Sequence, residues 1–102
     1  MGFGGPKLVR GMIELFLGNA PGRVVEARAA LDSGDAAALR TALHGLKSSA
    51  GQLGAITVFN ACEAGEDLAS LGDLKGCATH VAIVERDFPI ASRQLKAFAD
   101  AA

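Results

Sequence analysis

The sequence has no long hydrophobic run and no excess of charge of either sign. Its longest apolar stretches are short, as in "VAIV" at residues 81–84, far below the roughly 18 consecutive apolar residues that indicate a membrane span. Ten basic and eleven acidic residues give a net charge of -1, and no basic run is present that could neutralise a phosphate backbone. We therefore expect a cytoplasmic protein with no membrane insertion and no nucleic-acid partner.

Cysteine is scarce as well. Cys62 and Cys77 form neither a CxxC pair nor a metal-ligand spacing. Both lie in apolar surroundings of helical pattern, where cysteine usually behaves as a small buried hydrophobic residue. We expect two buried free thiols, no disulfide and no metal site.

The chain is long enough for one hydrophobic core. Half of its 102 residues are hydrophobic, and a chain of this size buries roughly 60 to 70% of its unfolded surface. We expect a single domain over residues 1–102 that folds without metal or disulfide.

The sequence also lacks sustained alternation of apolar and polar residues, which excludes a sheet and leaves helices. A short opening helix is expected from Pro6 to about Gly18. The "NAPGR" turn at residues 19–23 then starts a second helix, which runs to "DSGD" at residues 32–35. The "GFGG" start at residues 2–5 lacks the Gly-Lys-Ser/Thr ending of a phosphate loop and is interpreted as a flexible lead-in.

Three more helices follow in the same pattern. Asp35 is expected to cap the first of them, Gly54 to end it, and another helix to run from there to "SLGD" at residues 70–73. The last helix begins near Asp73 and continues through a kink at Pro89. The prediction is an all-α fold, an antiparallel four-helix bundle with a short additional N-terminal helix. The helix that Asp35 caps is the middle one of the five. Its apolar residues are spaced four, three, four and three apart, which is typical of the seam of a helix packed in a bundle, and they are Leu39, Leu43, Leu46, Ala50 and Leu53.

One histidine stands out on that middle helix. His44 lies beside the seam, and the residues on its ridge are cationic or small, with Arg40 one turn before it and Lys47 and Ser48 one turn after it. A core histidine would be flanked by bulky apolar residues and a hydrogen-bond partner. The imidazole is therefore expected to be exposed and reachable by the active site of another protein.

The same neighbours favour an arriving anion. Lys47, about 5 to 6 Å from His44 between β-carbons, can donate a charge-assisted hydrogen bond to a phosphoryl group on the imidazole. Ser48 can donate another. The small residues from Ser48 to Gly51 leave a shallow face on which a partner domain can lie.

At these residues the sequence resembles the histidine-containing phosphotransfer (HPt) domain of two-component phosphorelays. That family's pattern is a histidine, any residue, Leu, Lys, then small residues and a later Gly-Ala pair, and here it reads "HGLKSSAGQLGA". Its continuation matches Val58, Cys62 and Glu66. The match is strong over residues 39–66, although Ser48 stands where glycine is commonest.

The resemblance implies a function and a set of roles. His44 would accept the phosphoryl group from a receiver-domain aspartate or a histidine kinase and relay it to a response-regulator receiver. Lys47 would stabilise that group, and Arg40, Ser48, Gly51 and Gln52 would contact the partner. The partners would be receiver domains and a hybrid sensor histidine kinase. The chain would be a monomeric phosphocarrier that does not bind ATP and is not an enzyme, with no cofactor of its own and magnesium only on the receiver.

The sequence allows other interpretations. A docking module of the same fold, which regulates a receiver or kinase without being phosphorylated, is the alternative. A hydrolase is disfavoured because no serine or cysteine nucleophile with an orienting acid accompanies His44. His80 is interpreted as a surface residue, because no cation or small-residue face lies beside it. Glu63, Glu66 and Asp67 are interpreted as the solvated face of a helix.

Overall fold

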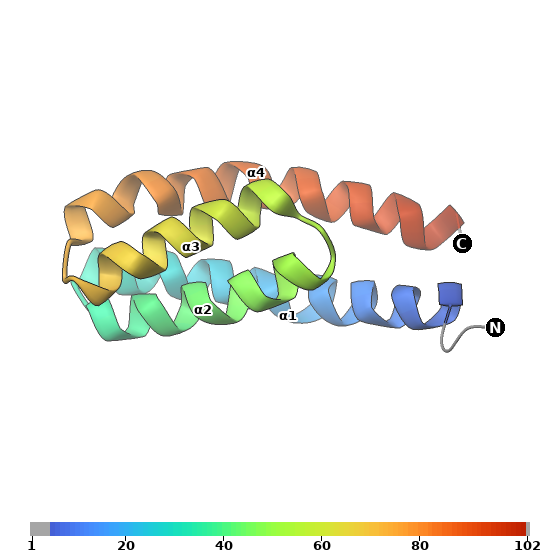
Figure 1. Cartoon of the computed structure of the whole chain (residues 1–102), viewed down its shortest axis with the longest axis horizontal. Coiled ribbons are helices and arrows are strands. Elements are labelled where there is room, and N and C mark those ends of the chain that lie inside the picture. The colour runs from blue at the N-terminus through green and yellow to red at the C-terminus, as the bar shows by residue number, and fades with distance from the viewer. Residues whose placement is uncertain (1–4, 102) are drawn as a thin grey trace.

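The computed structural model describes residues 5–101 as four helices joined by short turns (Figure 1). The helices are α1 (Gly5–Ser33), α2 (Ala36–Gln52), α3 (Ile56–Ser70) and α4 (Leu74–Ala101). They form an antiparallel bundle in which α2 packs on α1 and α3, and α4 packs on α1 and α3. The all-α bundle predicted from the sequence is confirmed. Most of the "GFGG" start lies outside the described residues.

The prediction of a separate N-terminal helix is wrong. Helix α1 runs without interruption through Gly18 and Pro21. One apolar stripe, made by Phe16, Ala20 and Ala27, is buried on both sides of the proline. A proline inside a helix costs about 3 kcal/mol through its missing N–H and its clash with the preceding turn, but Pro21 lies on the exposed side of α1. Packing of the continuous stripe outweighs that cost.

Helix α2 begins and ends where the sequence indicates. The Asp35 carboxylate accepts a hydrogen bond from the Ala38 N–H at 3.0 Å and so caps the first turn. The seam residues Leu39, Leu43, Leu46 and Ala50 are fully buried, and Leu53 at the end is half-buried. Gly54 then adopts a φ of 73°, a left-handed conformation that glycine adopts without strain, and turns the chain into α3.

Helix α3 approaches α2 closely at one glycine. A β-carbon on Gly65 would lie only 2.9 Å from Leu43 Cδ1 and 3.4 Å from His80 Cβ. Because non-bonded carbon atoms normally stay about 3.5 to 4 Å apart, only glycine fits between α2 and α4 here without a shift. This close approach brings the polar edge of α3 within hydrogen-bonding reach of α2.

Helix α4 is one long helix through Pro89, as predicted; the predicted kink stays a prediction. Its buried residues include Val81, Val84 and Phe88, and the Phe88 ring lies 5.5 Å from that of Phe16 on α1. Helices α1 and α4 have 29 and 28 residues, against 17 and 15 in the α2–α3 hairpin. The two long helices therefore extend together past that hairpin and give the molecule an elongated shape of 46 × 22 × 18 Å (Figure 1).

The two cysteines are buried and unbonded to each other, as the sequence predicts. Burial raises the pKa of the Cys62 thiol to about 12 and also raises that of Cys77. Because a thiol reacts as the thiolate, both side chains are unreactive packing residues at neutral pH.

Candidate functional site

His44 projects from the middle of α2 into solvent. Its side chain is 62% exposed, and its Nδ1 atom lies 3.0 Å from Oε2 of Glu66 on α3. An ionised carboxylate can only accept hydrogen bonds, so Nδ1 carries the hydrogen and donates it. In the neutral ring this leaves the lone pair on Nε2, the nitrogen that can act as a nucleophile.

The prediction that Glu66 lies with Glu63 and Asp67 on a solvated face is wrong. Glu63 and Asp67 are exposed, but Glu66 is 7% exposed and turns toward α2. The apolar pattern of α3 does not reveal this, because a glutamate at the border of the buried face looks the same as one beyond it. A signal was present in the continuation of the HPt pattern, where Glu66 fills the acidic position.

Lys47 completes the cluster from the next turn of α2. Its Nζ atom lies 2.9 Å from Glu66 Oε1, and its side chain is 23% exposed. Oε1 is buried, and the charge of the nearby ammonium compensates it. The role of Lys47 as a donor to a phosphoryl group stays a prediction, and the structure adds that the lysine pairs with a carboxylate.

The carboxylate at the centre stays ionised. Burial opposes its ionisation, but the hydrogen bonds and charges of Lys47 and His44 outweigh that effect and lower the pKa of Glu66. The hydrogen bond to Glu66 in turn raises the pKa of Lys47. At neutral pH the cluster therefore holds one buried anion between a fixed ammonium and an exposed imidazole.

The remaining predicted site residues lie on the same helix. Arg40, Ser48 and Gln52 are exposed. Gly51 is exposed too, but a β-carbon there would meet the Phe59 ring of α3 at 3.1 Å. Its small size is therefore required by the packing of α3 on α2, in addition to any role for a flat surface.

His80, the second histidine, is half-buried, so its interpretation as a surface residue is only partly correct. Its β-carbon faces the close approach at Gly65, between α3 and α4. It has no share in the cluster of His44, Lys47 and Glu66.

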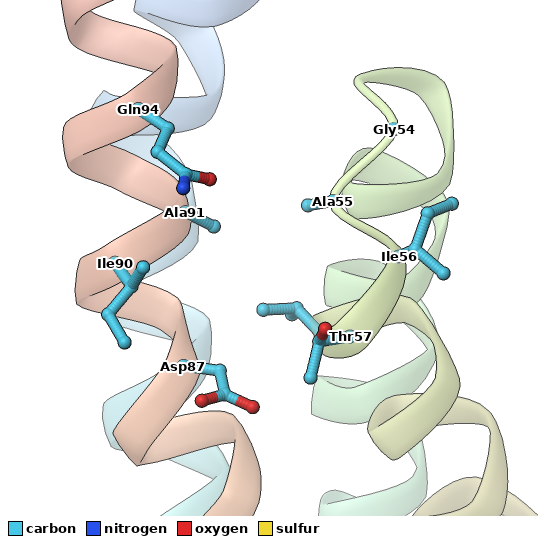
Figure 2. A pocket seen from close by; sticks show the side chains of 9 residues that line it. Gly54, Ala55, Ile56, Thr57, Asp87, Ile90, Ala91 and Gln94 are labelled. Carbon is cyan, nitrogen blue, oxygen red and sulfur yellow. The ribbon is translucent and has the colours of Figure 1, made fainter.

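A pocket of about 330 Å³ lies elsewhere, between the start of α3 and the middle of α4. Figure 2 shows Asp87 and Ala91 of α4 pointing toward the α3 segment that contains Thr57. None of the three residues of the His44 cluster lines this pocket. Because the His44 side chain is 62% exposed, the cluster presents its imidazole at the molecular surface, which suits contact with a macromolecule.

Two features are absent from the described residues 5–101. No group of three or more histidine, cysteine or acidic side chains in this range is arranged to hold a metal ion. No helix in it has the length and apolar character needed to cross a membrane.

Comparison with known families supports the resemblance seen in the sequence. The model of the Hpt domain family matches residues 11–102, which is most of the chain and includes the whole His44 cluster. Comparisons with curated proteins and with solved structures gave no match. Hpt domains are phosphocarrier modules of two-component signalling that interact with response regulators and kinases. The four-helix bundle and the family match together show that this chain belongs to the Hpt domain family.

Proposed function

We propose that this chain accepts a phosphoryl group on Nε2 of His44 and relays it to the aspartate of a response-regulator receiver. The donor is the aspartyl phosphate of another receiver domain, or a histidine kinase. One observation carries the proposal, namely the 3.0 Å contact between Nδ1 of an exposed imidazole and a buried carboxylate. This contact fixes the tautomer and leaves the outer nitrogen free to react.

The transfer step needs no proton movement at His44. The Nε2 lone pair attacks the phosphorus of the aspartyl phosphate and forms an N–P bond. The bond from phosphorus to the aspartate oxygen breaks, and the carboxylate leaves with that electron pair. Because Nδ1 keeps its hydrogen, the ring becomes positively charged, and Glu66 stabilises this charge through the same hydrogen bond. Transfer to the next receiver is the reverse of this step.

Lys47 supports the transferred group. Its ammonium has three donors, of which Glu66 occupies one side, so it can also bind a phosphoryl oxygen. Ser48, one turn from His44, offers a hydroxyl donor. The exposed surface around them, formed by Arg40, Ser48, Gly51 and Gln52, is the proposed contact with the receiver. The chain needs no cofactor of its own in this scheme, since the magnesium ion used in transfer belongs to the receiver.

The test is to mix the protein with phosphorylated receiver domains of its own organism and measure acid-labile, alkali-stable phosphate by intact mass. His44→Gln keeps a polar side chain on the exposed face of α2 and removes the nucleophile. His80→Gln is the matched control, because it removes the other histidine of the chain. We expect label on the wild type and on His80→Gln, and none on His44→Gln.

The alternative function predicts a different result. A docking module of the same fold would bind a receiver with measurable affinity and take up no phosphate from any of them. Label that persisted on His44→Gln would also overturn the proposal, because the acceptor would then be another side chain.

A further inference from the structure

The two flanks of His44 differ. Lys47 and Glu66 lie on the flank toward α3, whereas Arg23 of α1 lies on the other flank. The Arg23 guanidinium rests against Gly45, the residue that follows His44, with Cζ and Nε each 3.3 Å from the point that a β-carbon on Gly45 would occupy. The absence of a side chain at Gly45 thus lets a cation from α1 lie against the part of α2 that carries the phosphoacceptor.

The space around this guanidinium is open and polar. A pocket of about 420 Å³ between α1 and α2 is lined by Arg23 and Gly45 together with Asn19, Glu26 and Ser49. Arg23 is held only weakly there. Its nearest anion is Glu26, one turn along α1, at 3.7 Å, and the two side chains are 47% and 63% exposed. Exposed pairs of this kind contribute little stability, so the guanidinium can turn to another anion.

The charges at the site call for such a cation. In the free protein the Glu66 carboxylate already pairs with Lys47. A phosphoryl group on His44 adds close to two negative charges at neutral pH. The α3 flank then holds more negative than positive charge, and Arg23 is a cation from another helix that lies against the residue next to His44.

We infer that Arg23 binds the phosphoryl group carried by His44 from the α1 side, opposite Lys47. Phosphorylation of His44 draws the guanidinium away from Glu26 and toward the phosphoryl oxygens. Arginine suits this role because its planar fork of donors matches phosphate oxygens. This inference rests on the proposed function, since it requires His44 to carry the group.

The experiment uses phosphoramidate, a small donor that needs no partner protein. His44 Nε2 forms a bond to its phosphorus, the phosphorus–nitrogen bond of the reagent breaks, and ammonia leaves. The midpoint for the second ionisation of the phosphoryl group is then measured by phosphorus NMR, and the Arg23 Nε–H resonance is followed before and after phosphorylation. The other charged side chains on this part of α1, α2 and α3, which are kept in every variant, are Glu26, Arg40, Lys47, Glu63, Glu66 and Asp67.

Removal of a cation that contacts the phosphoryl group destabilises its doubly charged form. In Arg23→Gln we expect the midpoint to rise by roughly 0.2 to 0.7 pH unit, the value of one exposed ion pair. Arg23→Lys restores part of the shift. Gly45→Leu, which fills the position against which the guanidinium rests, gives a similar rise with the arginine still present. Arg93→Gln makes the same change of net charge on α4 and leaves the midpoint unchanged.

The outcomes separate the inference from the proposed function. If the wild type is labelled on His44 but Arg23→Gln and Arg93→Gln have the same midpoint as the wild type, and the Arg23 Nε–H resonance does not move on phosphorylation, the role of Arg23 is wrong and the proposed function stands. If the wild type takes no label on His44 while free histidine does under the same conditions, both fall. Thermal unfolding of each variant shows whether the fold is kept.

Discussion

Among the described residues 5–101, two glutamates form ion pairs between neighbouring helices, and their pairs are built differently. Between α1 and α4, the fork of Arg28 binds both oxygens of Glu85, with Nε 2.9 Å from Oε2. Between α2 and α3, Glu66 divides its oxygens between Lys47 and His44. The Glu85 side chain is 35% exposed and that of Glu66 is 9% exposed.

The difference shows how one kind of contact serves two purposes. The Arg28–Glu85 pair uses all of its carboxylate on one cation, so it connects two helices and has no group left to react. The Glu66 carboxylate is buried and shared, which orients an imidazole whose outer nitrogen remains free. In the proposed function, a buried carboxylate that is divided between two partners leaves an imidazole nitrogen free to react, whereas a carboxylate bound to one cation only joins two helices.

The largest expected effect comes from removing the Glu66 carboxylate, and removal of the Glu85 carboxylate is the comparison. Glu66→Ala takes away the acceptor that fixes the His44 tautomer and stabilises the charged ring, and we expect phosphorylation by a phosphorylated receiver to slow about 10- to 100-fold, the value of one hydrogen bond to a charged group. Glu85→Ala is the matched control, and its rate should stay within about twofold of the wild type because Glu85 pairs with Arg28. Rates are measured by the appearance of labelled protein.

Two results would break the comparison. Equal rates for both alanine variants would mean that Glu66 has no part in transfer. A loss in Glu66→Ala that follows the unfolded fraction of that variant would mean that Glu66 acts through stability only, so thermal unfolding is recorded for both variants.

The next effect tests the close packing that brings Glu66 to α2. Gly65→Val adds a β-carbon 2.9 Å from Leu43 Cδ1, and we expect the free energy of unfolding to fall by about 1 to 3 kcal/mol because such overpacking forces side chains to shift. Gly18→Ala on α1 is the control, since nothing lies within 4 Å of its added atom. That variant should gain about 0.5 to 1 kcal/mol from helix propensity. Denaturant unfolding measures both, and a neutral Gly65→Val would contradict the packing described here.

The sequence predicted most of the fold because its signals are local. The Asp35 cap, the glycine turn at Gly54 and the seam from Leu39 to Ala50 each depend on residues close in the chain. The prediction failed at Pro21, where a local breaker was outweighed by an apolar stripe that continues on both sides. Local rules do not weigh a proline against packing that other helices supply.

The candidate site was predicted in part for the same reason. His44, Lys47 and the small residues after them lie on one ridge of one helix, so their spacing is visible in the sequence. Glu66 comes from another helix, and its contact with His44 depends on the glycine at position 65 and the register of α3 on α2. Arg23 is further away still, and only the pairing of α1 with α2 brings it to Gly45.

A smaller effect is expected at the cation of the cluster. Lys47→Ala removes one donor to the phosphoryl group and the charge that compensates Glu66, and we expect transfer to slow about 3- to 10-fold. Lys75→Ala, an exposed lysine at the start of α4, is the control. Both rates are measured by mixing each variant with a phosphorylated receiver, quenching the reaction at set times and determining the intact mass. Unchanged kinetics in Lys47→Ala would remove the proposed role of Lys47.

The smallest effect concerns how acid and salt act on the two pairs. The pKa of Glu66 and that of Glu85 both lie below the usual value in the folded protein, for Glu85 chiefly because of the hydrogen bond from Arg28. Each carboxylate therefore adds stability above its unfolded pKa of about 4.3, and this stability is lost as the pH falls through the lower folded pKa. For Glu66→Gln and Glu85→Gln, we expect the free energy of unfolding to lie below that of the wild type by about 1 kcal/mol or less at pH 7. This difference in stability should shrink toward a constant value at pH 3.

Salt should then separate the pairs. In 1 M salt the screening length is about 3 Å, but screening reaches buried charges much less than exposed ones. In high salt, the part of the stability difference that depends on pH should therefore nearly vanish for the half-exposed Glu85 and persist for the buried Glu66. Urea unfolding of each variant and the wild type at pH 7 and pH 3, with and without salt, measures this stability difference. Equal loss of both contributions in salt would show that water reaches Glu66 as freely as Glu85, and the distinction between a site carboxylate and a helix-joining carboxylate would then have to rest on His44 alone.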